Sequence, residues 1–183
     1  MLKEVLKNYL DMMIEWHKEK YQSYPTVDVE MADEPSICFF GEIKEGGYIQ
    51  WSYVEQSNLI DFDALEEEFQ IHICDEVKQF YNSYFFLELY GFLDGEVIEF
   101  DPVTDDTEDI FVLSDENHPN FVRVGSYGNT PLSLCVDMES GKVYTWDYSD
   151  DTYEFEYENR YPEPELLADS LSDVLSRLSL ERA

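Results

Sequence analysis

The chain has few residues whose types and spacing could support catalysis. Its three histidines, His17, His72 and His118, lie far apart, and none belongs to a pair at the spacing of metal ligands. A nucleophile with a positioned base is not visible. The sequence therefore predicts no catalytic residue, no cofactor and no metal, and we interpret His17 as structural or merely exposed.

Carboxylates are abundant, but their number makes any single pair uninformative. A glycosidase needs two carboxylates at a defined separation inside a sugar-binding cleft, and the sequence cannot select such a pair. Asp147, Asp150 and Asp151 cluster, yet their segment lacks the alternating acids, central glycine and terminal glutamate of a calcium-binding EF-hand loop. Neither a GxGxxG motif nor a P-loop occurs. The unusual feature is therefore the distribution of the acids themselves.

The acidic residues outnumber what solubility requires. The 183 residues carry a formal charge of −31, whereas solubility calls for a magnitude of about 2 to 8 in a small domain. No lysine or arginine lies between Lys78 and Arg123, and Tyr153–Glu158 alternates aromatic with acidic residues, as in a strand with glutamates on one face. We interpret these acids as a partner-binding face, the alternative being a solvated face. The predicted face comprises Asp101, Asp105, Asp106, Glu108, Asp109, Asp147, Asp150, Asp151, Glu154, Glu156 and Glu158.

The sign of this charge restricts the class of partner. A strongly negative field repels nucleic acid and anionic lipid, and it accelerates encounter with cationic molecules. We therefore expect a basic protein partner, no nucleic acid and no direct insertion into a membrane. The N-terminal stretch lacks the uninterrupted apolar segment of a signal peptide. Cys38, Cys74 and Cys135 lie among apolar residues, and we interpret them as reduced core residues of a cytoplasmic protein.

Hydrophobic periodicity predicts one α+β domain over residues 1–183. Apolar residues at three- and four-residue steps predict helices over about 2–20, from Asp61, around Val77–Tyr84 and along Leu167–Leu178. Between them, a period of two predicts a largely antiparallel sheet whose candidate strands are 85–90, 95–100, 109–113, 121–127, 131–138, 142–148 and 152–158. The clearest hairpin is Cys135–Tyr144, because Gly141 can supply the positive φ of its turn.

The first half of the chain resembles the Syd family, bacterial proteins named for their interaction with SecY. The resemblance lies in motifs similar to the family's WHxE…WP, PSPCI, VYWQ, AVERAFDI and FYxxxF patterns, here Trp16–Pro25, Pro35–Cys38, Tyr48–Trp51, Ala64–Ile71 and Phe80–Phe85. The second half resembles the wider SUKH superfamily, to which Syd belongs. There the similarity rests on the hairpin within Gly125–Asp147 and on the final helix over Leu167–Leu178.

This resemblance implies an α+β fold with a curved sheet and no catalytic function. It also implies one of two roles: an immunity protein that neutralises a basic toxin domain, such as a nuclease, or a regulator whose acidic concave face binds the basic cytosolic loops of SecY. The second role would place the protein at the inner face of the cell membrane through its partner. The chain departs from Syd after about residue 90, which favours immunity. An enzyme and a mimic of DNA are further alternatives.

Overall fold

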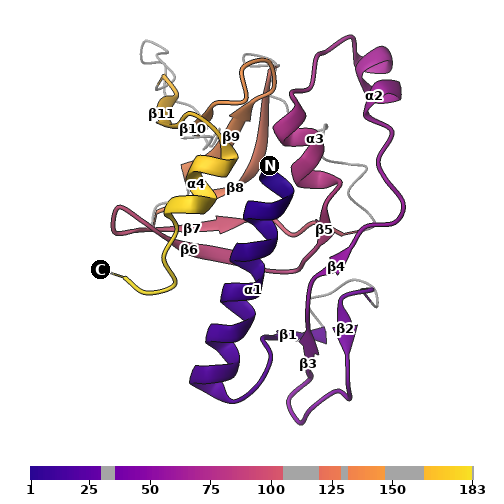
Figure 1. Cartoon of the computed structure of the whole chain (residues 1–183), viewed down its shortest axis with the longest axis vertical. Coiled ribbons are helices and arrows are strands. Elements are labelled where there is room, and N and C mark those ends of the chain that lie inside the picture. Colours follow the sequence, from indigo (N-terminus) through magenta and orange to yellow (C-terminus); the bar gives the residue numbers. More distant parts are fainter. Residues whose placement is uncertain (30–35, 105–119, 129–131, 147–162, 183) are drawn as a thin grey trace, which may run out of the picture.

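A long amphipathic helix, α1 (Leu2–Tyr21), runs down the middle of the view in Figure 1. The computed structural model describes residues 1–29, 36–104, 120–128, 132–146 and 163–182. The apolar stripe of α1 is buried, which confirms the helix predicted from its periodicity. The helix ends at Gln22, whose backbone has the left-handed conformation typical of a helix C-terminus.

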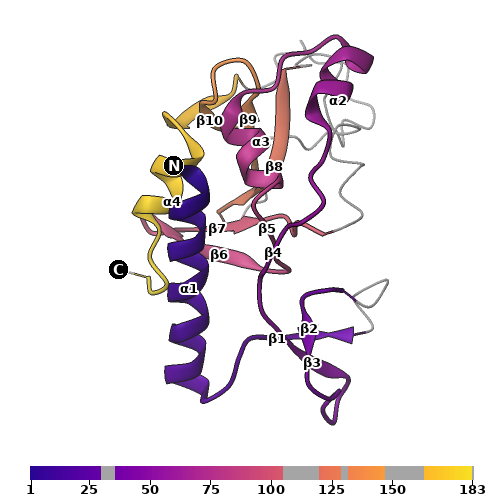
Figure 2. The same cartoon turned by 45° about the vertical axis from the view of Figure 1, so that its right-hand side comes forward.

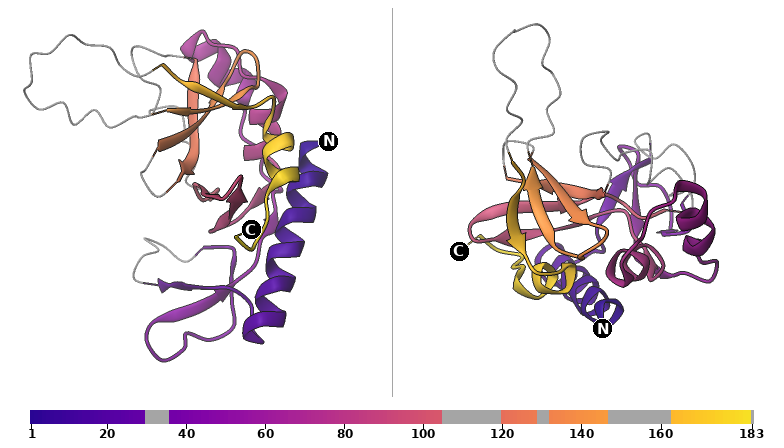
Figure 3. Two further views of the ribbon diagram at one scale, coloured as in Figure 1. Left: turned by 90° about the vertical axis from the view of Figure 1, so that its left-hand side faces the viewer. Right: turned by 90° about the horizontal axis from the view of Figure 1, so that it is seen from above.

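Six antiparallel strands form the main sheet, in the order β11-β10-β9-β8-β7-β6. Their bounds are β6 (Leu89–Leu93), β7 (Glu96–Phe100), β8 (Phe121–Tyr127), β9 (Leu132–Asp137), β10 (Val143–Trp146) and β11 (Glu165–Ala168). Figure 3 shows that the sheet is strongly curled and that α1 and α4 (Leu171–Arg177) lie side by side on one of its faces. The predicted α+β fold with a curved antiparallel sheet is thus confirmed.

Strand β8 carries a bulge against β9 and, at Gly125, passes unusually close to β7. The register shifts between Arg123 and Gly125, and Gly125 lies opposite Phe100. A Cβ atom at Gly125 would collide with the carbonyl oxygen of Glu99 and the Cα atom of Phe100. Bulges increase the local twist of a sheet, so the absence of a side chain here permits the sharp curl between these strands.

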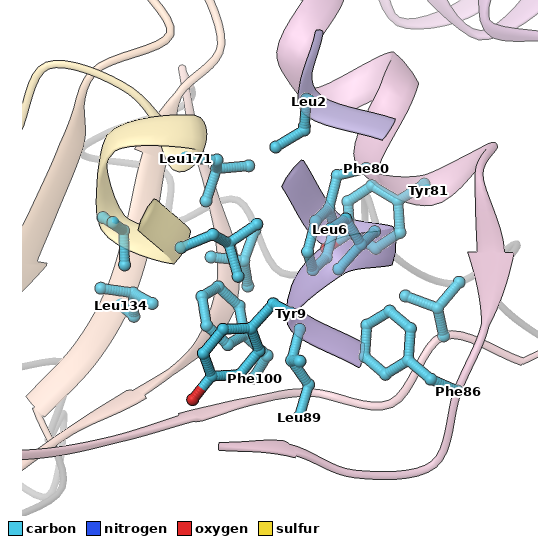
Figure 4. Close-up of a cluster of buried hydrophobic side chains, with 14 of the residues drawn as sticks. Leu2, Leu6, Tyr9, Phe80, Tyr81, Phe86, Leu89, Phe100, Leu134 and Leu171 are labelled. Carbon is cyan, nitrogen blue, oxygen red and sulfur yellow. The ribbon is translucent and has the colours of Figure 1, made fainter. Parts of the chain in front are cut away.

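The core lies between the main sheet and the helices. Figure 4 shows Leu2, Leu6 and Tyr9 of α1 pointing into a cluster with side chains from α3 (Asp75–Tyr81), the sheet and α4. The labelled members from these other elements and the loop before β6 are Phe80, Tyr81, Phe86, Leu89, Phe100, Leu134 and Leu171. Burying each large apolar side chain contributes about 1.5 to 3 kcal/mol, so this cluster holds α1 against the sheet.

A second, small sheet lies beside the far half of α1, apart from the main sheet (Figure 2). Its order is β1-β3-β2, with bounds β1 (Thr26–Asp28), β2 (Phe39–Phe40) and β3 (Tyr48–Trp51). The two short strands β4 (Val54–Glu55) and β5 (Tyr84–Phe85) pair with each other, and helix α2 (Phe62–Phe69) lies between them in the chain. Helix α2 starts from Asp61 as predicted, and Asp61 caps it by accepting a hydrogen bond from the Ala64 backbone nitrogen at 3.1 Å.

Two predicted helix boundaries are wrong. Tyr84 does not extend the third helix, because the chain leaves α3 after Tyr81 and Tyr84 pairs with Glu55 of β4. Leu167 is not in the final helix either, since residues around it pair with β10 as the edge strand β11. The helix begins only at Leu171, after the cap at Ser170. The strands predicted at 109–113 and 152–158 lie outside the described residues.

Candidate functional site

The face of the main sheet opposite α1 and α4, here called the open face, carries a row of polar residues. Tyr90 of β6 lies directly opposite Glu99 of β7, and Glu99 lies opposite Ser126 of β8. Successive side chains of a strand point to opposite faces. Because Leu89 and Ile98 are buried under the helices, Tyr90 and Glu99 lie on the open face.

A pocket of about 540 Å³ opens on this face, where β6, β7 and β8 meet. Its polar lining combines carboxylates with one cation, an aromatic ring and a hydroxyl. These residues are Glu88, Tyr90, Glu99, Asp101, Arg123 and Ser126. Leu87 and Pro102 add apolar groups to the wall, while Leu89 and Phe100 also line it although their side chains are buried in the core. The pocket thus offers both negative charge and apolar surface to a ligand.

Glu88 is a half-buried carboxylate without a cation of its own among the described residues. Burial raises its pKa above the ordinary value, and the neighbouring charge of Glu99 raises it further. Removing a carboxylate from water is costly unless an opposite charge compensates it. An approaching lysine or arginine side chain would supply that compensation.

Asp101, in contrast, has a partner within the pocket. Its Oδ1 atom lies 3.2 Å from Nη2 of Arg123, whose Nε also donates to the Gly125 carbonyl oxygen at 3.2 Å. Burial nevertheless raises the pKa of Asp101, although the guanidinium of Arg123 opposes this shift. When Glu88, Glu99 and Asp101 are all ionised, the one positive charge of Arg123 does not balance them, and the pocket is negatively charged.

Of the predicted acidic face, Asp101 is the member that the structure describes, and it lines the pocket. The other ten predicted residues lie outside the described residues: Asp105, Asp106, Glu108, Asp109, Asp147, Asp150, Asp151, Glu154, Glu156 and Glu158. Sequence reasoning missed Glu88 and Glu99. The available signal was the alternation of these acids with apolar residues in the segments FLELY (86–90) and VIEFD (97–101). In a strand, this alternation places Glu88 on the same face as Tyr90, and Glu99 on the same face as Asp101.

The histidines and cysteines show no arrangement for catalysis in the described part of the chain. His17 Nε2 lies 2.8 Å from the Tyr90 hydroxyl, a structural contact between α1 and β6. Cys38 and Cys135 are buried and Cys74 is partly buried, and all three are free thiols. No group of three or more histidine, cysteine or acidic residues among those described is arranged to hold a metal ion.

The protein is an α+β fold whose curled antiparallel sheet carries helices on one face and an acidic pocket on the other face. These are the features of a binding module. The family model of the Syd protein (SUKH-2) matches residues 1–114, and the chain belongs to this family. Members of the Syd and SUKH families are generally non-catalytic binding or immunity proteins, so membership supports a protein-binding role.

None of the curated proteins searched matches the chain. In the part of the chain that the structure describes, no helix combines the length and the apolar character needed to cross a membrane.

Proposed function

We propose that this protein binds a basic protein partner through the open face of its main sheet, and that the pocket receives a lysine or arginine side chain of the partner. The half-buried Glu88 carboxylate carries this proposal, since the described residues provide it with no cation. Tyr90 adds an aromatic wall, and aromatic faces attract cations. The ten further acids predicted for the partner-binding face lie outside the described residues, and we propose that they also take part in binding.

Immunity against a basic toxin domain is the role that we favour. The Syd family model matches residues 1–114, and the acid-rich remainder of the chain lies beyond the match. That remainder includes Arg123 and Ser126 of the pocket, so part of the proposed site is outside the Syd-like region. In a nuclease toxin, the cationic cleft that binds phosphate would be the natural target of such a surface.

Binding to the basic cytosolic loops of SecY is the second candidate. The match to the Syd family itself favours it, because the resemblance to Syd implies that partner. Glu88, Glu99 and most of the other pocket residues fall within the matched part of the chain. The protein would then attach to the inner face of the membrane through SecY alone.

Co-expression with toxins encoded beside its gene tests the favoured role. Rescue of growth is expected, together with a complex that weakens as salt rises, because the Debye length shortens to about 8 Å at physiological ionic strength. Glu88→Gln should weaken that complex roughly tenfold or more, the scale of a charged hydrogen bond, and Glu96→Gln on the same hairpin should not. If no neighbouring toxin is neutralised and detergent-solubilised SecY is retained at low salt, the SecY role replaces immunity.

A further inference from the structure

Tyr90 is held from α1 at two points. The Tyr9 hydroxyl donates a hydrogen bond to the Tyr90 carbonyl oxygen at 2.8 Å, and His17 Nε2 shares a hydrogen bond of 2.8 Å with the Tyr90 hydroxyl. Tyr9 and His17 are eight residues apart, about 12 Å along the helix axis. One contact therefore fixes the backbone of β6 beside the pocket, and the other fixes the far end of the Tyr90 side chain.

The close approach of α1 to β6 depends on Gly91. A Cβ atom at this position would collide with the Tyr9 hydroxyl and would lie 3.2 Å from Cβ of Leu178. The residue after Tyr90 thus lacks a side chain at the point where the helix passes. This geometry allows α1, which lies on the opposite face of the sheet, to reach a residue of the pocket wall.

His17 sits in a mixed aromatic and charged environment. Its ring centroid lies 5.2 Å from that of Trp16, 5.4 Å from that of Tyr21 and 6.4 Å from that of Tyr90. Burial lowers the pKa of His17, and the positive charge of Lys20 lowers it further. Both effects favour the neutral imidazole, in which one ring nitrogen can donate a hydrogen bond and the other can accept one.

We propose that His17 is a positioning residue: it holds the Tyr90 hydroxyl so that the Tyr90 ring stands as a fixed wall of the pocket, against which a cationic side chain of the partner packs. A wall that is ordered before binding loses less conformational freedom when the ligand arrives. This inference rests on the proposed function, because it assigns a role in the same pocket. It also gives the Trp-His segment of α1 a role in recognition.

The first test needs no partner. NMR of ¹⁵N-labelled imidazole rings should show a changed tautomer ratio or pKa for His17 in Tyr90→Phe, since this variant removes the hydroxyl and keeps the ring. Lys20 and Tyr21 on α1 also face His17, and they are unchanged in the variant. Tyr144→Phe, on β10, is the matched control and should leave His17 as in the wild type. An unchanged His17 in Tyr90→Phe would overturn the proposal.

The second test measures binding of a defined probe, the blocked peptide Gly-Gly-Arg-Gly-Gly, with norleucine in place of arginine as its control. The arginine peptide should shift the backbone amides of Glu99 and Ser126. His17→Leu and Tyr90→Phe should each weaken binding about fivefold, the effect of one neutral hydrogen bond, and the double variant should bind no more weakly than either. His17→Gln should retain most of the affinity because its amide can replace Nε2.

The outcomes separate this inference from the proposed function. If the arginine peptide binds the wild type and His17→Leu equally well, the pocket binds cations but His17 does not position its wall, and the inference is overturned. If the arginine peptide binds no better than the norleucine peptide, cation recognition by the pocket is wrong, and the inference falls with it. Thermal unfolding of each variant confirms that it is folded.

Discussion

Glu76 of α3 caps the first turn of α4, although the two helices are far apart in the sequence. One oxygen of its carboxylate accepts a hydrogen bond from the Leu171 backbone nitrogen, and the other accepts from the Ser172 hydroxyl, both at 2.7 Å. The first backbone nitrogens of a helix have no partner within it, so a carboxylate placed there satisfies them. This contact fixes α4 against α3 and, with it, one wall of the core.

Replacing Glu76 with alanine should destabilise the fold. We expect the free energy of unfolding to fall by about 1 to 2 kcal/mol, the effect of losing a helix cap, as measured by denaturant titration. Asp75→Ala is the matched control, because Asp75 is the exposed neighbouring acid in the first turn of the same helix, α3. Equal losses in the two variants would contradict the capping role of Glu76.

Gly125→Ala tests the close approach of β7 and β8. The new Cβ atom would meet the Glu99 carbonyl oxygen and the Phe100 backbone, which cannot move without separating the strands. We expect a loss of about 3 kcal/mol, at the upper end of the usual cost of overpacking. Gly95→Ala is the control, because Gly95 has a positive φ of 88° but open space around its Cα atom. It should cost only about 1 kcal/mol in the same denaturation experiment.

Glu88→Gln should stabilise the protein at neutral pH and not at acidic pH. The pKa of Glu88 is raised above its ordinary value of 4.5, first by burial and then by Glu99, so the folded state binds the proton more tightly than the unfolded state. Protonated Glu88 therefore contributes to the free energy of unfolding. This contribution is complete below pH 4.5 and is lost as the pH rises through the folded-state pKa of Glu88. Ionised Glu88 therefore costs stability at pH 7, and glutamine removes that cost.

Thermal unfolding at two pH values measures this effect. The unfolding midpoint of Glu88→Gln should exceed that of the wild type at pH 7. The two midpoints should converge at about pH 4, just below the ordinary pKa of a glutamate carboxyl. Glu96→Gln removes the same charge from the same hairpin outside the pocket, and it controls for general repulsion in an acidic protein. An equal gain in both variants would attribute the effect to net charge instead of burial.

The local elements of this fold could be read from the sequence because local physics determines them. Helix α1 follows from its apolar stripe, and the cap at Asp61 follows from a side chain that bonds three residues ahead. The hairpin of β9 and β10 follows from its turn, where Gly141 has a φ of 73° and donates to the Asp137 carbonyl oxygen at 2.7 Å.

The pocket could not be predicted in the same way, because it depends on strand register. Glu88, Glu99 and Ser126 meet only when β6, β7 and β8 pair as they do, and that register is set between strands that are separated in the sequence. The strand β11 was missed for a related reason. Its apolar residues continue the helical spacing of α4, and the pairing with β10 that makes them a strand involves residues about twenty positions earlier.

The glutamate row that begins at Glu154 gives the sharpest test of the larger acidic surface. We expect replacement of Glu154, Glu156 and Glu158 with lysine to abolish binding of the basic partner, because three attractive charges become repulsive ones facing a surface of the same sign. Surface plasmon resonance against the toxin domain or the SecY loops measures the loss, and any residual association should be slowest at low salt, where the repulsion is least screened.

A matched triple variant distinguishes this surface from a general effect of net charge. Glu42, Glu45 and Glu139 are exposed and lie outside the pocket, so their replacement with lysine changes the net charge by the same amount at other positions. This control should retain most of the affinity, because exposed charges separated by more than about 8 Å are largely screened at physiological salt. If both triple variants lose binding equally, the partner responds to the total charge of the protein. If neither variant loses binding, the glutamate row is only a solvated face and the pocket alone carries recognition.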